Sequence, residues 1–131
     1  MQRVLTYTAR STAMPEQAWA LLVRPDRWAE WAPHLRGAWG LGRPEVRPGA
    51  RGAALLLGVV PVPAKIVEKG VRSWTWRVGP VEMVHRVQPA PGGCVVAIDL
   101  NSSPPVERVL SLTYGPVIAL LLRNLARVAA R

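Results

Sequence analysis

One segment near the start of the chain constrains the fold more than any other: PEQAWALLVRPDRWAEWAP, from Pro15 to Pro33. Pro15 suits the first turn of a helix, where its missing N–H is not needed, and Pro25 ends that helix. A second short helix carries Trp28 and Trp31 and ends before Pro33. A strand precedes these two helices, and most of the chain after them has β-strand character until a long apolar helix closes it. That order predicts a sheet wrapped around a single helix.

The length and composition fit one compact domain spanning residues 1–131. Half of the residues are apolar, which is enough for a core with surface left over to line a pocket. Phe is absent, so Trp, Leu and Val must fill the interior. The single cysteine, Cys94, excludes an internal disulfide and is expected to be a buried, inert thiol. The first residues, MQRVLTYTAR, lack the apolar region of a signal peptide, so we expect a soluble, cytoplasmic protein.

The net charge of +9 raises the question of a polyanionic partner. The arginines are scattered and form no basic run, and no phosphate-binding loop or zinc spacing accompanies them, so nucleic-acid binding is not expected. Arg123, Arg127 and Arg131 recur at i, i+4 spacing on the last helix. Either these arginines simply face solvent, or they give the helix a peripheral contact with an anionic membrane. We favour the first interpretation.

The strand pattern predicts seven strands joined by short Gly/Pro turns, which favours an antiparallel meander. Pro61 and Pro63 are assigned to a turn, and the apolar run AALLLGVV places the third strand in the middle of the sheet. The expected strands are residues 3–12, 35–41, 51–60, 64–69, 72–78, 81–88 and 94–100.

The last part of the chain is predicted to be helical and broken. Pro104 and Pro105 open it, and Gly115-Pro116 interrupts it, so the firm helix is residues 117–131. Its inward face is expected to carry Val117, Leu121, Leu125 and Val128.

The stretch AMPEQAWALLVRPDRWAEWAP resembles the opening of the START-like (SRPBCC) superfamily, which includes polyketide cyclase/dehydrase-type and Bet v 1-like proteins. The segment HRVQPAPGGCVVAIDL resembles the penultimate hairpin of those proteins, and the terminal helix sits where they place a long packing helix. The resemblance implies an α+β helix-grip fold: a curved seven-stranded antiparallel sheet around a long C-terminal helix, with two short helices between strands one and two. It also implies a cavity between sheet and helix, but no shared catalytic motif.

His85 is the sharpest candidate for chemistry, because it lies in phase with Met83 on one strand while Trp74 and Trp76 share a face of the preceding strand. His85 has three readings: a core histidine bonded to backbone, a polar contact for a ligand, or a general acid/base. The residues expected to contact a ligand are Trp39, Trp74, Trp76, Met83, His85, Tyr114 and Leu121.

Other polar and aromatic residues receive plainer interpretations. Trp28 and Trp31 are expected to pack at one end of the sheet. Asp99 and Glu82 alternate away from the inward face, so we expect solvent contact or pairing with arginine. Only two histidines are present, on distant segments, so neither a metal centre nor a cofactor is expected.

Three functions stay open at this stage. The first is sequestration of a small apolar ligand such as a lipid, an isoprenoid or a polyketide-like molecule. The second is a polyketide cyclase or dehydratase-like enzyme that uses His85 as acid/base, which requires a second acid or base within its reach. The third is an interaction module whose basic surface binds an anionic membrane or nucleic acid.

Overall fold

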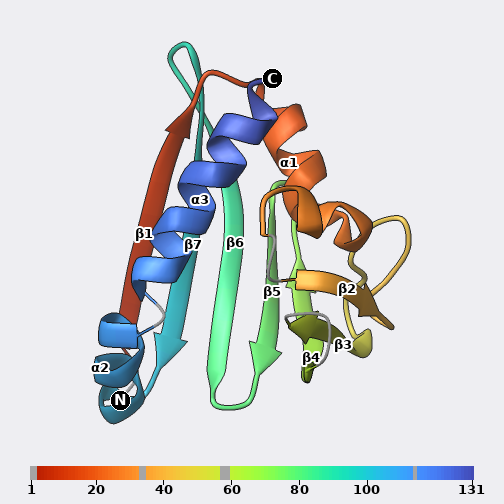
Figure 1. Ribbon diagram of the computed structural model, residues 1–131, viewed down its shortest axis with the longest axis vertical. Helices are drawn as coiled ribbons and strands as arrows, with labels where there is room; N and C mark the ends of the chain where they lie inside the picture. Colours follow the sequence, from red (N-terminus) through yellow and green to blue (C-terminus); the bar gives the residue numbers. More distant parts are fainter. Residues whose placement is uncertain (1–2, 33–34, 57–59, 114) are drawn as a thin grey trace.

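The computed structural model describes residues 3–32, 35–56, 60–113 and 115–131, and it contains a seven-stranded sheet with helices on one side (Figure 1). The strands are β1 Arg3–Ser11, β2 Leu35–Trp39, β3 Arg51–Leu56, β4 Val60–Lys69, β5 Ser73–Val78, β6 Val81–Ala90 and β7 Gly93–Ser102. The helical elements are α1 Pro15–Val23, the 3₁₀ helix η1 Pro25–Glu30, α2 Pro104–Thr113 and α3 Gly115–Ala129.

All neighbouring strands are antiparallel, in the order β1-β7-β6-β5-β4-β3-β2. Tight turns join the long central strands: Gly79 and Gly92 adopt φ of 58° and 79°, a left-handed conformation that glycine reaches without strain. The first strand then pairs with the last, so the chain's two halves meet along β1 and β7. This is the antiparallel sheet that the sequence predicts.

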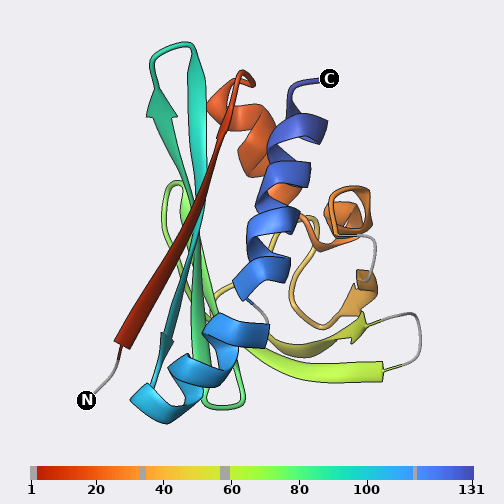
Figure 2. The ribbon, with the colours of Figure 1, turned by 60° about the vertical axis from the view of Figure 1, so that its left-hand side comes forward.

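The sheet curves around the helices (Figure 2). Seen nearly edge-on, α1, η1 and α3 lie on one side of it, and β2, β3 and β4 curl toward them. Helix α3 packs against β1, β7 and α1. Apolar side chains from the sheet, from α1 and from α3 form one core, which includes Leu21 and Leu22 of α1, Val96 of β7 and Leu122 of α3. The expected helix-grip architecture is confirmed.

Strands β3 and β4 differ from the sequence prediction. β4 begins at Val60, so Pro61 and Pro63 lie inside a strand and not in a turn. Proline is tolerated there because β5 pairs with β4 only from Lys65 onward, which leaves the start of β4 with one neighbouring strand. β3 is not central: it pairs with β4 and with the edge strand β2.

The C-terminal helices are broken near Gly115, as predicted, but the buried face of α3 is not the predicted one. Its buried side chains include Ile118, Leu122, Leu125 and Ala129, whereas Val117 is exposed and Leu121 and Val128 are half-buried. The first half of α3 is apolar almost all round, so its pattern does not fix which side faces the sheet. Ala126 and Ala129, being small, allow the helix to approach its neighbours closely.

Candidate functional site

An aromatic cluster lies between the sheet and the helices. Two of its members come from β5 and one from β6, because antiparallel pairing places Trp74 opposite His85 and Trp76 opposite Met83. These four side chains are buried. The sequence predicted both the shared face and this adjacency. Trp28 of η1 completes the cluster, which we define as Trp28, Trp74, Trp76 and His85.

The rings of the cluster are in direct contact. Trp74 is stacked on both sides, by His85 at a centroid distance of 3.8 Å and by Trp28 at 5.5 Å. Trp76 stands almost perpendicular to all three, at 5.4 to 5.6 Å. Each such aromatic pair contributes about 0.5–1.5 kcal/mol beyond the area it buries. The cluster is therefore a rigid wall.

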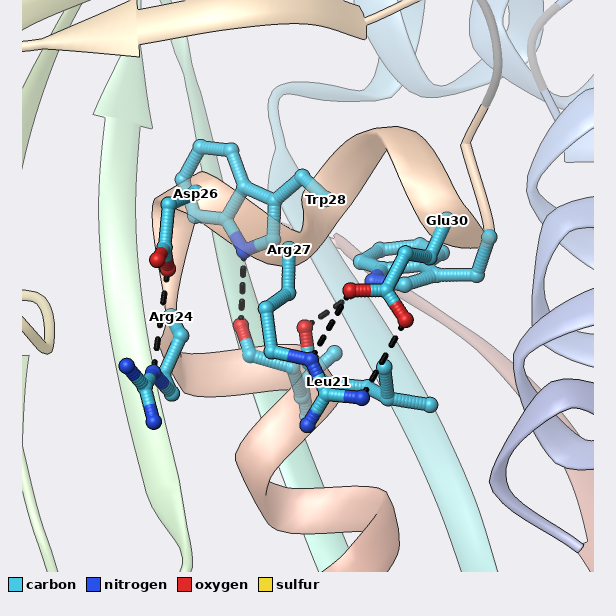
Figure 3. Close-up of polar contacts among 8 residues, drawn as sticks. Leu21, Arg24, Asp26, Arg27, Trp28 and Glu30 are labelled. Carbon is cyan, nitrogen blue, oxygen red and sulfur yellow. Dashed lines mark hydrogen bonds and ion pairs between the residues drawn. The ribbon is translucent and has the colours of Figure 1, made fainter.

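The end of α1 positions the cluster through its free carbonyl groups. The indole N–H groups of Trp28 and Trp74 both donate to Leu22 O, at 2.9 and 3.1 Å, and that of Trp31 donates to Leu21 O at 2.9 Å. The last carbonyls of a helix have no partner within the helix, so these indoles satisfy them. Figure 3 shows Trp28 directed at this last turn.

Trp76 differs from the other three indoles because it donates to a sulfur atom. Its Nε1–H points to Met83 Sδ at 3.1 Å, and a thioether is only a weak acceptor. Trp76 therefore has the one N–H among these four indoles that is not bound to a backbone oxygen. A ligand oxygen in its reach would be a better partner.

Burial lowers the pKa of His85 to about 3. Hydrogen bonds with the backbone of Trp74 and Met83 and the charge of Asp99 raise this pKa, but by less than burial lowers it. The imidazole is therefore neutral near pH 7. Its Nδ1 lies 3.3 Å from Trp74 O, which can only accept, so the tautomer with the proton on Nδ1 makes this hydrogen bond. A neutral imidazole has one unprotonated nitrogen, which accepts hydrogen bonds.

The cluster borders an inner cavity of about 30 Å³. This is room for about one water molecule, so the described side chains nearly fill the space. The lining is apolar apart from His85 and the indole N–H groups, and it includes no second acid or base. It consists of Trp28, Trp31, Trp74, Trp76, Met83, His85, Ile98, Ile118 and Leu121.

Of the seven predicted ligand contacts, five line the inner cavity and Trp39 does not. Trp39 is 51% exposed and lines a separate surface hollow of about 560 Å³ with Asp26 and Arg43. The prediction placed Trp39 on the face of Leu41, which is buried. β2 ends at Trp39, and the next residue, Gly40, adopts a φ of 77°, so the alternation does not continue from Trp39 to Leu41. Tyr114 lies outside the described residues.

The lining also contains residues that sequence reasoning did not assign to a site. Trp28 and Trp31 were interpreted as packing at one end of the sheet, and Ile98 and Ile118 were not considered. Ile98 could have been found, because it faces His85 across the β6–β7 pair. Trp28 could not, because its contact depends on the path of η1 from the end of α1.

The outward face of the sheet carries paired charges, as predicted. Asp99 accepts from Arg86 at 2.9 Å and from Thr6 at 2.8 Å, and Glu82 pairs with Arg77 at 2.6 Å. The Arg86 guanidinium holds the pKa of Asp99 below its usual value. The described residues contain no group of three or more side chains placed to hold a metal ion. Over the same part of the chain, no helix has the length and hydropathy needed to cross a bilayer.

The curved sheet, the enclosed helix and the cavity between them define a START-like helix-grip protein. The chain belongs to the family described as polyketide cyclase / dehydrase and lipid transport, whose model matches residues 2–130. No curated protein matches the sequence.

Solved structures share the fold at low sequence identity. A protein from Nitrosomonas europaea has a TM-score of 0.76 at 16% identity, over 95% of this chain and 92% of its own. A START superfamily protein from Mycobacterium smegmatis has a TM-score of 0.69 at 14% identity, over 95% of this chain and 97% of its own. The protein Ara h 8.0201 has a TM-score of 0.71 at 11% identity, and all of both chains is covered. These similarities establish the fold.

Proposed function

We propose that this protein binds a small apolar ligand, of lipid, isoprenoid or polyketide type, between the sheet and α3. One observation carries the proposal: the indole N–H of Trp76 donates to a thioether in a site where the neighbouring indoles are bound to backbone oxygen. A ligand hydroxyl or carbonyl supplies the missing strong acceptor. The apolar lining, the helix-grip scaffold and the lipid-transport description of the family support the same conclusion.

Binding requires the inner cavity to open, because about 30 Å³ holds no such ligand. Met83 and Leu121 are the side chains that can give way: Met83 is unbranched and flexible, and Leu121 is half-buried at the cavity wall. Burying about 300 Å² of apolar ligand surface yields roughly 7 kcal/mol before association costs. We therefore expect affinity in the micromolar range.

The environment of His85 supports binding over proton transfer. A general acid/base works best with a pKa near the operating pH, and burial puts the pKa of His85 far below neutrality. Among the described residues, the lining of the inner cavity also offers no second titratable partner. A neutral His85 instead orients a ligand hydroxyl through its unprotonated ring nitrogen.

Mass spectrometry of the freshly purified protein, first native and then after solvent extraction, tests the proposal. We expect a co-purified apolar molecule, or uptake of an added apolar fluorescent probe. Trp76→Phe keeps the ring and removes the donor, so it should weaken binding of an oxygen-bearing ligand about tenfold. Trp39→Phe is the matched control and should leave binding unchanged. A clean protein that takes up no probe contradicts the proposal.

A further inference from the structure

Leu121 separates the inner cavity from a second space on the outside of the protein. It lines the inner cavity together with Trp31 and Ile118, and it also lines a surface hollow of about 480 Å³. We call this space the α3 hollow; its lining residues are Leu120, Leu121, Arg123, Asn124 and Arg127. Among the described residues, the half-buried Leu121 is the side chain that lines both spaces.

The α3 hollow has an apolar part and a cationic part. Leu120 and Leu121 form the first, and Leu120 is 65% exposed. Arg123 and Arg127 form the second, four residues apart on one face of the helix and both exposed. The described side chains that line the hollow include no carboxylate, so none of them neutralises the two guanidinium groups.

Asn124 connects the cationic part to the inner cavity. Its Nδ2 donates to Trp31 O at 2.8 Å, and Arg127 donates to its Oδ1. Trp31 in turn lines the inner cavity. Arg127 has five N–H donors, so this bond leaves others for an anion. The network holds the cationic part beside the wall formed by Leu121.

We propose that the ligand is a single-chain anionic amphiphile: an alkyl chain that passes Leu121 toward the aromatic cluster, and an anionic head bound by Arg123 and Arg127. The inference rests on the proposed binding function and adds the ligand class and the side of entry. Charge complementarity carries it, because an apolar surface and two cations meet at Leu121, which lines both the cavity and the hollow. A carboxylate or phosphate head makes charge-assisted hydrogen bonds with guanidinium groups.

The test compares dodecanoate with dodecanol, which share an alkyl chain and differ in head group. Each is titrated, below its micellar concentration, against protein that holds the apolar fluorescent probe, and displacement of the probe is measured. We expect dodecanoate to bind about tenfold more tightly at low salt. The double variant Arg123→Gln/Arg127→Gln should remove most of that preference, and added salt should reduce it. Arg43→Gln/Arg51→Gln removes the same charge from exposed positions elsewhere and should preserve the preference.

The outcomes separate this inference from the proposed function. Equal binding of both ligands, or a preference that survives Arg123→Gln/Arg127→Gln, overturns the inference and leaves the binding function standing. Binding of neither ligand overturns both. Displacement of dodecanoate by inorganic phosphate alone would indicate a plain anion site and overturn the inference. So would binding to phosphatidylglycerol vesicles without binding of monomeric dodecanoate, which would indicate a membrane-docking face.

A blocking variant tests the path. Leu121→Trp enlarges the shared wall and should weaken both ligands by the same factor, because it obstructs the chain and leaves the head site intact. Leu112→Trp introduces the same side chain at an exposed position of α2 and should change neither. Unchanged binding in Leu121→Trp contradicts entry past this residue.

Discussion

The buried, neutral state of His85 makes stability depend on pH in a calculable way. Burial lowers its pKa to about 3 in the folded protein, whereas an unfolded chain has a histidine pKa of about 6.5. Between these values only the unfolded state takes up the proton. The stability contributed by a neutral His85 is therefore complete above about pH 6.5 and is lost progressively as the pH falls toward 3.

The two pKa values give the size of the effect. Lowering the pH from about 7.5 to 5.0 should reduce the free energy of unfolding by about 2 kcal/mol from His85 alone. The carboxylates with lowered pKa, Glu16, Glu30 and Asp99, contribute stability in the same direction, but their contribution is lost mainly below pH 4.5. The interval from pH 7.5 to 5.0 therefore lies above the range in which these three carboxylates lose their contribution.

Urea unfolding followed by tryptophan fluorescence, at the two pH values, measures this difference. His85→Phe keeps a ring against Trp74 and removes the titrating group, so its stability should change by less than about 0.5 kcal/mol over the same interval. An equal loss in both proteins would contradict this prediction, because the proton uptake would then belong to another group.

Three further predictions concern packing and reactivity. Gly115→Ala should destabilise the protein by about 1–3 kcal/mol, because the added methyl group meets the Tyr7 ring, whose Cζ lies 2.9 Å from the new carbon. Denaturant unfolding measures the loss, and in a Tyr7→Ala background the same substitution should cost less. The Cys94 thiol is buried and its pKa is raised by that burial, so a thiol reagent should label it only as the protein unfolds; fast labelling of the native state contradicts this. Asp99→Asn should cost no more than about 1 kcal/mol, because the Arg86 pair is partly solvated; a loss of several would show a buried network instead.

The sheet and half of the site could be predicted because their geometry follows from local rules. The period of two along β5 and β6 places Trp74, Trp76, Met83 and His85 on one face, and the Gly79-Pro80 turn sets the register that joins them. These relations need no knowledge of distant contacts. The break at Gly115 follows in the same way from the proline after it.

The missed parts depend on contacts between distant segments or on irregular backbone. Trp28 joins the cluster because the carbonyl of Leu22 receives two indole N–H groups, one of them from a strand 52 residues away. The exposure of Trp39 follows from the end of β2 at that residue and from the positive φ of Gly40, which break the alternation before Leu41. The rotation of α3, which buries Ile118 and Leu122 and leaves Val117 exposed, is set by packing against α1 and the sheet.

The most direct test of the account is a two-dimensional ¹⁵N–¹H spectrum of the six indole N–H groups during titration with dodecanoate. The Trp76 signal should move most, because its weak thioether acceptor is replaced or its surroundings change. The signals of Trp28 and Trp74, held by the Leu22 carbonyl, should move less, and exposed Trp39 should stay in place. A saturable shift confined to Trp39, or no indole shift at any ligand concentration below micelle formation, would contradict binding at the aromatic cluster.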